Sequence, residues 1–198
     1  TRLNAGSKNQ KQALGFYVSN FSLRMDMDTN ILQTPQKPVV QTIMHEISNY
    51  EKHPAGQNVV VAVLSYKGYN MEDAIVLNKS SIERGLGRST YYRPSLAEEL
   101  RYSGGLIDEV GIPDKDVKGY KSEKDYRLLE EDGIVFLESK VKPDDVIIGK
   151  TSPPRFLSGM DEYNLASNVR RESSVTIKHG ERGIVDFVAL TENEEGNK

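Results

Sequence analysis

The stretch Gly56 to Gly85, GQNVVVAVLSYKGYNMEDAIVLNKSSIERG, decides how the rest of this 198-residue chain is interpreted. It opens with an unbroken apolar run, Val59 to Leu64. A short run rich in β-branched residues and bounded by Gly56 and Gly68 predicts a strand buried on both faces. A second apolar run, Ala74 to Leu77, predicts the partner strand of a rigid hairpin.

Two adjacent acids, Glu72 and Asp73, lie between these runs. Carboxylates are costly to bury without a partner, so we expect both to face solvent, a cation or a basic partner. Mg²⁺ often takes one or two protein carboxylates, while phosphate and water oxygens complete its shell. The pair is therefore a candidate partial Mg²⁺ site, and the alternative is a solvated acidic turn. Beyond it, Ser80 and Glu83 have capping-box spacing and Gly85 can end a helix, which predicts a short helix.

Composition excludes several classes of protein. The chain has no cysteine, so a disulfide framework, a thiolate metal site and a cysteine nucleophile are all excluded. No apolar run approaches the roughly 20 residues that span a bilayer, and no signal-peptide pattern is present. We therefore expect a cytoplasmic protein with no membrane partner.

The charge is unevenly distributed along the chain. Residues 1–93 carry 11 Lys and Arg against 7 Asp and Glu, whereas residues 94–198 carry 15 against 22. Such asymmetry predicts two modules with different partners. The basic half suits phosphate, and the acidic half suits solvent or protein.

Residues 1–23 predict a helix that follows a polar loop. Two interpretations of its polar side chains stay open. In the first, they are the solvated face of an ordinary surface helix. In the second, Arg2, Lys8 and Lys11 contact a phosphate backbone, and Gln12 donates hydrogen bonds to sugar or phosphate.

A calcium site is excluded in the next segment. Asp26, Asp28 and Asn30 imitate the start of a calcium-binding loop. The sixth position is Ile31 where glycine is needed, however, and the twelfth is Lys37 where a bidentate glutamate belongs.

The second half predicts a small antiparallel β-module, since short apolar runs alternate with Gly, Pro and Asp pairs. The expected strands are 134–137, 146–148, 175–177 and 184–190. Residues 126–131 predict a helical turn, and residues 153–171 predict a surface loop with the pair Arg170–Arg171 near its end. We expect this pair to be solvated, and the alternative is a contact with nucleic acid. Val39 to Tyr50 predicts an irregular segment or a short strand and turn. The fold class expected is α+β, mainly β.

Self-contained hydrolysis is disfavoured. Neither a Gly-x-Ser-x-Gly elbow nor a Walker A loop is present, and no nucleophile–base pair is visible. A stand-alone Mg²⁺-dependent phosphohydrolase centred on Glu72 and Asp73 would need further carboxylates or a base at recognisable spacing.

Several motifs together resemble one known family. GQNVVVAVLSYKGYNMEDAIVLNKSSIERGL resembles the signature of the second-largest (B, or β-type) subunit of multisubunit DNA-dependent RNA polymerases, closest to the archaeal and eukaryotic branch. The resemblance continues, in one order along nearly the whole chain, through KQALG (11–15), ILQTPQKPVV (31–40), EDGIV (131–135), DVIIGKTSPPRF (145–156) and ERGIVD (181–186).

The resemblance implies a fold and a role for each half. Residues 1–92 resemble part of the hybrid-binding region, which lines the cleft for the RNA–DNA hybrid and contributes strands to a double-psi β-barrel. Residues 93–190 resemble the wall (the flap in bacteria), which steers the hybrid and docks initiation factors. Residues 191–198 are a polar tail that leads to a missing segment. The other partners implied are the largest polymerase subunit and the remaining core subunits.

The resemblance also implies site residues. In the YNxED motif, Asp73 and then Glu72 are expected beside the Mg²⁺ that the incoming NTP carries, shared with the NTP and the largest subunit. Arg2 matches an arginine that faces the triphosphate, although the family's SPRNT motif is replaced here by TRLNAG. Lys11 and Gln12 match a pair that faces the hybrid. We expect the chain alone to be inactive and to bind Mg²⁺ weakly. The alternative is a β-rich docking module for initiation factors with no direct catalytic role.

Overall fold

The computed structural model describes residues 14–15, 18, 20–24, 28–154, 170–193 and 196. The chain divides into two compact units, residues 1–94 (unit 1) and residues 95–198 (unit 2). Its described part is mainly β, with a few short helices and small sheets, as the sequence predicts. The double-psi β-barrel remains a prediction.

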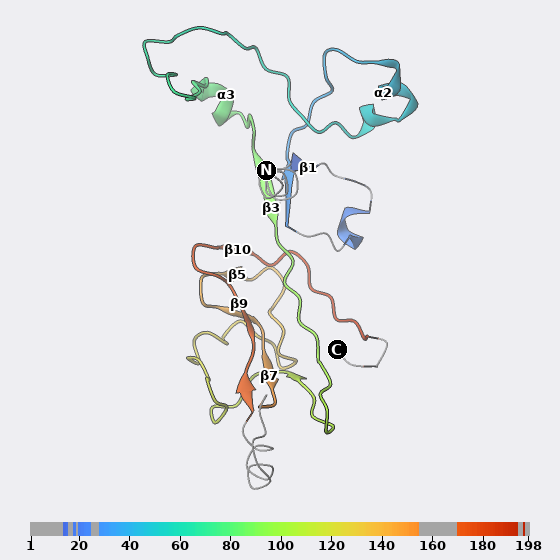
Figure 1. Ribbon diagram of the computed structural model, residues 1–198, viewed down its shortest axis with the longest axis vertical. Helices are drawn as coiled ribbons and strands as arrows, with labels where there is room; N and C mark the ends of the chain where they lie inside the picture. The colour runs from blue at the N-terminus through green and yellow to red at the C-terminus, as the bar shows by residue number, and fades with distance from the viewer. Residues whose placement is uncertain are drawn as a thin grey trace. The chain divides into compact units, whose positions relative to one another are not determined.

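Unit 1 is built on a three-stranded sheet of order β1-β2-β3 (Figure 1). Its strands are β1 (Leu14–Gly15), β2 (Thr29–Leu32) and β3 (Ser89–Tyr92). β1 runs parallel to β2 and β3 runs antiparallel to it, with Thr29 opposite Tyr92. Ile31 and Leu32 of the central strand are almost fully buried, so β2 is the apolar centre of this unit.

The remaining elements of unit 1 are short helices. They are η2 (Phe21–Leu23), α2 (Ile43–Ile47), η3 (Tyr50–Lys52) and α3 (Lys79–Glu83). α3 confirms the helix predicted before Gly85, but its N-cap is Asn78, whose side chain accepts a hydrogen bond from Ser81 N at 3.1 Å. Gly85 lies at φ 109°, and Leu86 N donates to Ser81 O at 3.0 Å. These features form a Schellman motif, which needs a left-handed residue at this position.

Three expectations for unit 1 are wrong. The helix expected within residues 1–23 is not formed at Leu14–Gly15, which is a strand. The edge of β2 supplies hydrogen-bond partners for the backbone of these residues. Val39 to Tyr50 contains α2, which follows the prolines that suggested an irregular segment. Val59 to Leu64 and Ala74 to Leu77 are not strands.

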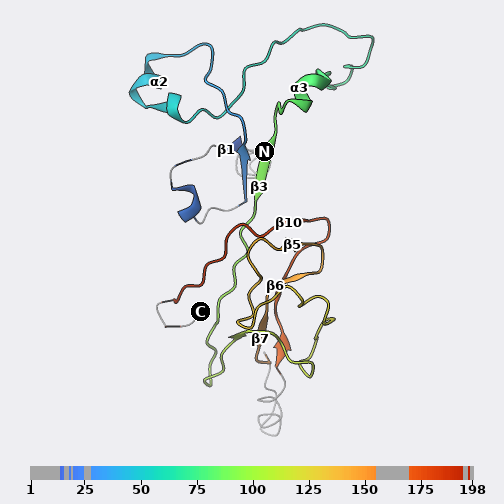
Figure 2. The same ribbon diagram turned by 180° about the vertical axis from the view of Figure 1, so that it is seen from behind.

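The physical reason for the last error is the lack of a ladder partner. Among the described residues, no backbone hydrogen bond joins either apolar run to another segment. Val60 and Val63 are accordingly 102% and 97% exposed. Figures 1 and 2 both show the trace between α2 and α3 running without a neighbouring strand. A strand pattern in the sequence becomes a strand only when partner groups are within reach.

Unit 2 contains seven short strands in its described part. They pair as a β4-β7-β8 sheet and as the two-stranded sheets β10-β5 and β6-β9, all antiparallel. Their bounds are β4 (Glu109–Val110), β5 (Lys140–Val141), β6 (Val146–Ile148), β7 (Lys150–Ser152), β8 (Arg171–Glu172), β9 (Val175–Thr176) and β10 (Gly183–Ile184). The expected antiparallel module is present. Residues 134–137 form only isolated bridges, however, and residues 126–131 form turns rather than helix. Of the expected strand 184–190, only Ile184 lies in a strand.

A single apolar core holds unit 2 together. Val146 is fully buried at its centre, on β6 (Figure 2). Tyr120 and Tyr126 stack on one another with ring centroids 5.1 Å apart. The other buried members of the cluster are Leu129, Val135, Val141 and Ile147. This core is the main stabilising feature of unit 2, since burial of apolar area drives folding.

Three glycines meet where loops cross beside this core. Gly111 N donates to Gly149 O at 3.0 Å, and Gly149 N donates to Gly133 O at 2.7 Å. A Cβ on Gly133 would lie 2.7 Å from the carbonyl carbon of Gly111, which is closer than real Cβ atoms approach. Only glycine fits such a junction of three backbones.

A buried ion pair ties β7 to the segment before β4. Lys150 Nζ lies 2.6 Å from Asp108 Oδ2 and donates to Glu98 O at 2.6 Å. Burial raises the pKa of the Asp108 carboxyl, but the contacts with Lys150 and Ser152 outweigh burial and lower this pKa overall.

Arg170 is part of this structure rather than a solvated side chain, which corrects the sequence-based expectation. Its guanidinium donates to Thr151 Oγ1 at 2.9 Å and to Ile107 O at 3.0 Å, and it lies 3.2 Å from Glu109 Oε1. Sequence reasoning missed this role because it depends on strand pairing. β8 begins directly after Arg170, and the pairing of β8 with β7 brings the Arg170 guanidinium onto Thr151. Most of the predicted loop 153–171 lies outside the described residues.

Candidate metal and phosphate site

The acidic turn begins with a tight turn at Tyr66 to Tyr69. Tyr69 N donates to Tyr66 O at 3.0 Å, and the two central residues, Lys67 and Gly68, have φ of 48° and 79°. Positive φ at both central positions is typical of a type I′ turn. Gly68 occupies the second central position, where glycine adopts the positive φ without steric cost.

A second turn of the same kind carries the two acids. Ala74 N donates to Met71 O at 3.4 Å, and the central residues Glu72 and Asp73 have φ of 53° and 72°. A non-glycine residue in this left-handed region costs about 1–2 kcal/mol. Two such residues in succession persist only where the surroundings hold them, and strained backbone of this kind concentrates at functional sites.

Asn70 braces the first turn from the inside. Its Oδ1 accepts a hydrogen bond from Tyr66 N at 2.8 Å, and its Nδ2 donates to Leu64 O at 2.6 Å. One side chain thus binds both backbone groups that flank Ser65, at the end of the Val59–Leu64 run. The brace sits directly N-terminal to Met71, where the acidic turn starts.

The base of the same loop is closed by Gln57. Its Oε1 accepts from Gly87 N at 2.8 Å, and its Nε2 donates to Thr34 O at 2.9 Å. Gly87 follows α3 and Thr34 follows β2, so Gln57 fixes both ends of the Gly56–Gly85 stretch to the frame of the sheet. Amide side chains, rather than apolar packing, hold this stretch.

The two carboxylates themselves have no protein partner among the described residues. Glu72 and Asp73 are both exposed, and within the described residues neither side chain forms a hydrogen bond or an ion pair. Adjacent, exposed and unpaired carboxylates fit the one or two protein ligands that Mg²⁺ commonly takes. They do not form a complete cage, because the part of the chain that the structure describes contains no cluster of three metal-ligating side chains.

The other predicted site residues cannot be placed. Arg2, Lys8, Lys11 and Gln12 lie outside the described residues. Their contacts with the triphosphate and the hybrid therefore remain predictions.

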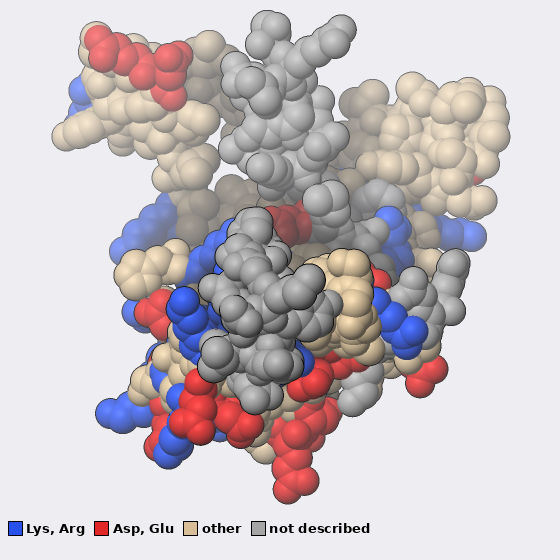
Figure 3. Space-filling view, turned by 60° about the horizontal axis from the view of Figure 1, so that its bottom comes forward, with Lys and Arg blue, Asp and Glu red and all other residues tan. Residues whose placement is uncertain are grey.

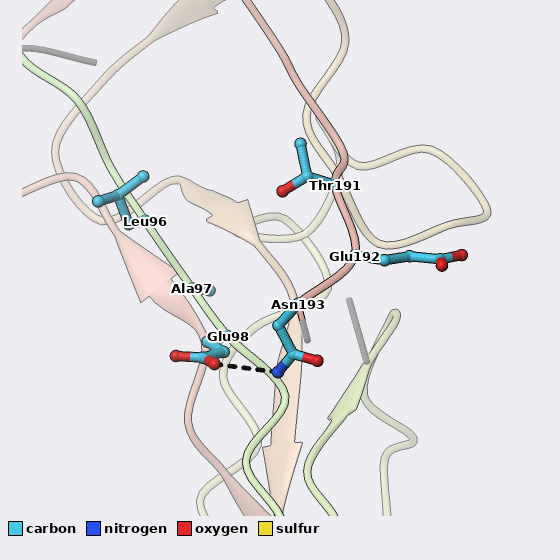
Figure 4. Close-up of a pocket in the computed structure, with 6 residues that line it drawn as sticks. All are labelled: Leu96, Ala97, Glu98, Thr191, Glu192 and Asn193. Atoms are coloured by element: carbon cyan, nitrogen blue, oxygen red, sulfur yellow. Dashed lines mark hydrogen bonds between the residues drawn. The ribbon is translucent and has the colours of Figure 1, made fainter. Parts of the chain in front are cut away.

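The face of unit 2 seen in Figure 3 carries charges of both signs. Figure 3 shows Lys and Arg interspersed with Asp and Glu over its described part. An open pocket of about 450 Å³ lies between two segments of this unit, residues 96–98 and 191–193 (Figure 4). Asn193 Nδ2 donates to Glu98 Oε1 at 3.1 Å across it. Glu98 and Glu192 make the pocket acidic, so it does not suit phosphate.

Comparison with known proteins decides the family. A family model described as "RNA polymerase Rpb2, domain 6" matches residues 1–198. The chain belongs to this family. The resemblance inferred from the YNxED stretch and its neighbours is thereby confirmed.

Individual relatives agree with this assignment. The DNA-directed RNA polymerase subunit Rpo2 of Sulfolobus acidocaldarius is 50% identical over 95% of this chain, and that of Saccharolobus solfataricus is 49% identical over the same share. The DNA-directed RNA polymerase II subunit RPB2 of Schizosaccharomyces pombe is 38% identical, also over 95% of the chain. The chain spans 16–17% of the length of these relatives.

Membership of the Rpb2 domain 6 family does not by itself explain how the acidic turn is held in place. Sequence reasoning identified the two acids but overlooked Asn70 and Gln57, the side chains that hold them in place. A signal for Asn70 was present, because Asn in turns binds nearby backbone groups more readily than most residues do. No described helix is long and apolar enough to span a membrane.

Proposed function

We propose that this chain forms part of the catalytic core of a DNA-directed RNA polymerase, where unit 1 lines the RNA–DNA hybrid cleft and helps place the Mg²⁺ carried by the incoming NTP. One observation carries the proposal. Glu72 and Asp73 are held side by side in a left-handed turn, exposed and without protein partners among the described residues. Membership of the Rpb2 family supports it.

The proposed role of this chain is positioning and electrostatics. When bound, Mg²⁺ neutralises phosphate charge, which is the main requirement of phosphoryl transfer. Asp73 is the first choice as ligand and Glu72 the second. Neither acts as a nucleophile or a base; their exposed carboxylates attract the cation and orient it.

Basic residues of unit 1 complete the proposed site. Arg2 would face the triphosphate, and Lys8, Lys11 and Gln12 would contact the hybrid backbone. The positive charge of Arg2, Lys8 and Lys11 complements phosphate and is consistent with the excess of basic residues in the first half. These contacts predict binding that weakens steeply with salt.

The proposed partners are the largest polymerase subunit and the other core subunits. Val59 to Leu64 is exposed in this chain, including Val60 and Val63. Exposed apolar runs with unpaired backbone groups favour pairing with another segment. The assembled subunit would supply that segment and complete the double-psi β-barrel.

The test is nucleotide addition by the assembled polymerase that carries Asp73→Ala. We expect a raised KM for NTP and a raised Mg²⁺ requirement, because NTP–metal placement is weakened. Asp116→Ala is the matched control, since Asp116 is an exposed aspartate of unit 2. Unchanged elongation at limiting NTP would refute the role of Asp73.

The chain by itself should be inactive and should bind Mg²⁺ only weakly. Two carboxylates without phosphate oxygens make an incomplete site. Calorimetry of Mg²⁺ binding to the isolated chain checks this expectation, and a dissociation constant of about 1 mM or tighter would contradict it.

A second function is favoured for unit 2, namely docking of initiation factors. Its own apolar core and the mixed charge of the face seen in Figure 3 suit a protein partner better than phosphate. Capture of initiation factors by residues 95–198 tests this function. Capture that depends on residues 1–94 alone would argue against it.

A further inference from the structure

The side chain of Asn70 connects two separate features of unit 1. It binds Tyr66 N and Leu64 O, the backbone groups at the entrance of the acidic loop. It also directly precedes Met71, whose carbonyl closes the turn that contains Glu72 and Asp73. A change at Asn70 therefore alters the start of the segment that projects both carboxylates.

The loop needs such a brace because its backbone is unfavourable. Lys67, Glu72 and Asp73 all have positive φ, and none of them is glycine. Each costs about 1–2 kcal/mol in this region, whereas a well-formed hydrogen bond contributes about 1 kcal/mol. Two hydrogen bonds from one amide offset part of this cost, so without them the loop would relax to other conformations.

Apolar packing does not replace the brace. Tyr66, Tyr69 and Met71 are 51%, 73% and 66% exposed. Among the described residues, this part of the loop is fixed by the backbone hydrogen bonds of the two turns and by those of the Asn70 amide. Its effect is thus local and separable from the sheet.

We propose that Asn70 is the positioning residue of the acidic turn and sets the affinity of the Glu72–Asp73 pair for the Mg²⁺–NTP complex. This inference rests on the proposed function of the two acids. Asn70 itself touches neither metal nor substrate. It acts through the backbone, by keeping the two carboxylates in one preorganised orientation.

The chain offers a matched control in Asn58. Its Oδ1 accepts from Val39 N at 3.2 Å and its Nδ2 donates to Lys37 O at 2.7 Å. Asn58 therefore bridges two backbone groups with the same chemistry as Asn70, in the same unit, but away from the acidic turn. Asn58→Ala removes these two hydrogen bonds and a longer one from Nδ2 to Gln36 Oε1, at 3.5 Å.

The experiment measures single-nucleotide addition by assembled polymerase over a range of NTP and Mg²⁺ concentrations. We expect Asn70→Ala to raise the KM for NTP about fivefold, as loss of a hydrogen-bonded brace predicts, and to change kcat less. The Mg²⁺ concentration for half-maximal rate should rise with it, and so should the dissociation constant of the Mg²⁺–NTP complex, measured by equilibrium binding without turnover. Asn58→Ala should leave all three values unchanged.

A second-site variant tests whether the effect passes through the backbone. Lys67→Asn places before Gly68 the residue that most favours a type I′ turn. Combined with Asn70→Ala, it should restore part of the KM, because it stabilises the same loop conformation without restoring the amide. In an Asp73→Ala background, Asn70→Ala should have little further effect, since coupled residues are not additive.

The outcomes separate the two proposals. If Asp73→Ala raises KM while Asn70→Ala behaves as the parent enzyme, the role of Asn70 is refuted and the function of the acids stands. If Asp73→Ala has no effect, the proposed function itself fails. A fall in kcat without a change in KM or Mg²⁺ requirement would show that Asn70 is only structural.

Should the polymerase that carries Asn70→Ala fail to assemble, Asn70→Ser replaces it. This variant keeps one polar group and serves for the same comparison and the same refutation.

Discussion

The two units of this chain are stabilised in different ways. Unit 2 buries a cluster around Val146, whereas the Gly56–Gly85 stretch of unit 1 exposes its apolar run and is held by amide side chains. A valine is 102% exposed at position 60 and fully buried at position 146. The difference shows that an apolar pattern alone does not establish a core. The unit that keeps its functional groups exposed depends on hydrogen bonds and, in our proposal, on partner chains.

The largest expected effect is on the buried ion pair of unit 2. Lys150→Met removes the cation 2.6 Å from the Asp108 carboxylate, whose side chain is fully buried. Loss of one member of a buried pair costs about 3–5 kcal/mol. Urea unfolding followed by hydrogen exchange of unit 2 amides should show this loss. Lys124→Met, at an exposed lysine of the same unit, is the control, and equal stability of the two variants would refute the structural role of the pair.

The glycine junction should show a smaller but specific effect. Gly133→Ala combines overpacking against Gly111 with a left-handed residue, for an expected loss of about 3 kcal/mol. Gly105→Ala separates the two causes, because Gly105 has φ of 77° but no atom within 4 Å of the position that an added Cβ would take. Urea midpoints of the two variants measure the difference. A loss at Gly105 as large as that at Gly133 would mean that close packing is not responsible.

The two valines test the comparison of the units most directly. Val146→Ala should destabilise unit 2 by about 2 kcal/mol, since it removes two buried methyl groups and leaves a cavity. Val60→Ala should change the stability of the isolated chain by less than about 0.5 kcal/mol, as at other exposed sites. In the assembled polymerase, Val60→Ala should become costly if another segment covers it. Hydrogen exchange in both states measures these values, and an effect of Val60→Ala in the isolated chain would contradict the exposed conformation.

The sequence could predict the family, the mainly β class and the exposed acids, because each depends on local residue type or on a motif that extends through the chain. It also predicted α3, although the N-cap is Asn78 rather than Ser80. Errors occurred where structure depends on distant partners. Val59 to Leu64 has a strand pattern but no ladder partner in the described part of the chain, and Arg170 is held by Thr151 and Ile107, which no local pattern connects to it. Asn70 was overlooked because its function lies in backbone bonds within a turn.

The smallest expected effect is the change in the stability of unit 2 with pH. The direction of this change distinguishes the influence of the Lys150–Asp108 ion pair from that of burial. The folded-state pKa of Asp108 lies below its ordinary value near 3.8, because the Lys150 and Ser152 contacts outweigh burial. Its contribution to stability is therefore complete above that ordinary value and is lost as the pH falls through the folded-state pKa. Lys150→Met removes the cation and leaves burial, which raises the pKa of Asp108, opposed only by the contacts with Ser152 and Leu100. We therefore expect this pKa to be higher in the variant than in the parent chain, so the variant should lose less stability on acidification. Urea unfolding between pH 6 and about pH 3 measures both trends. Parallel pH profiles for the parent chain and the variant would show that Lys150 does not control the charge of Asp108, and that the unit depends on its apolar core alone.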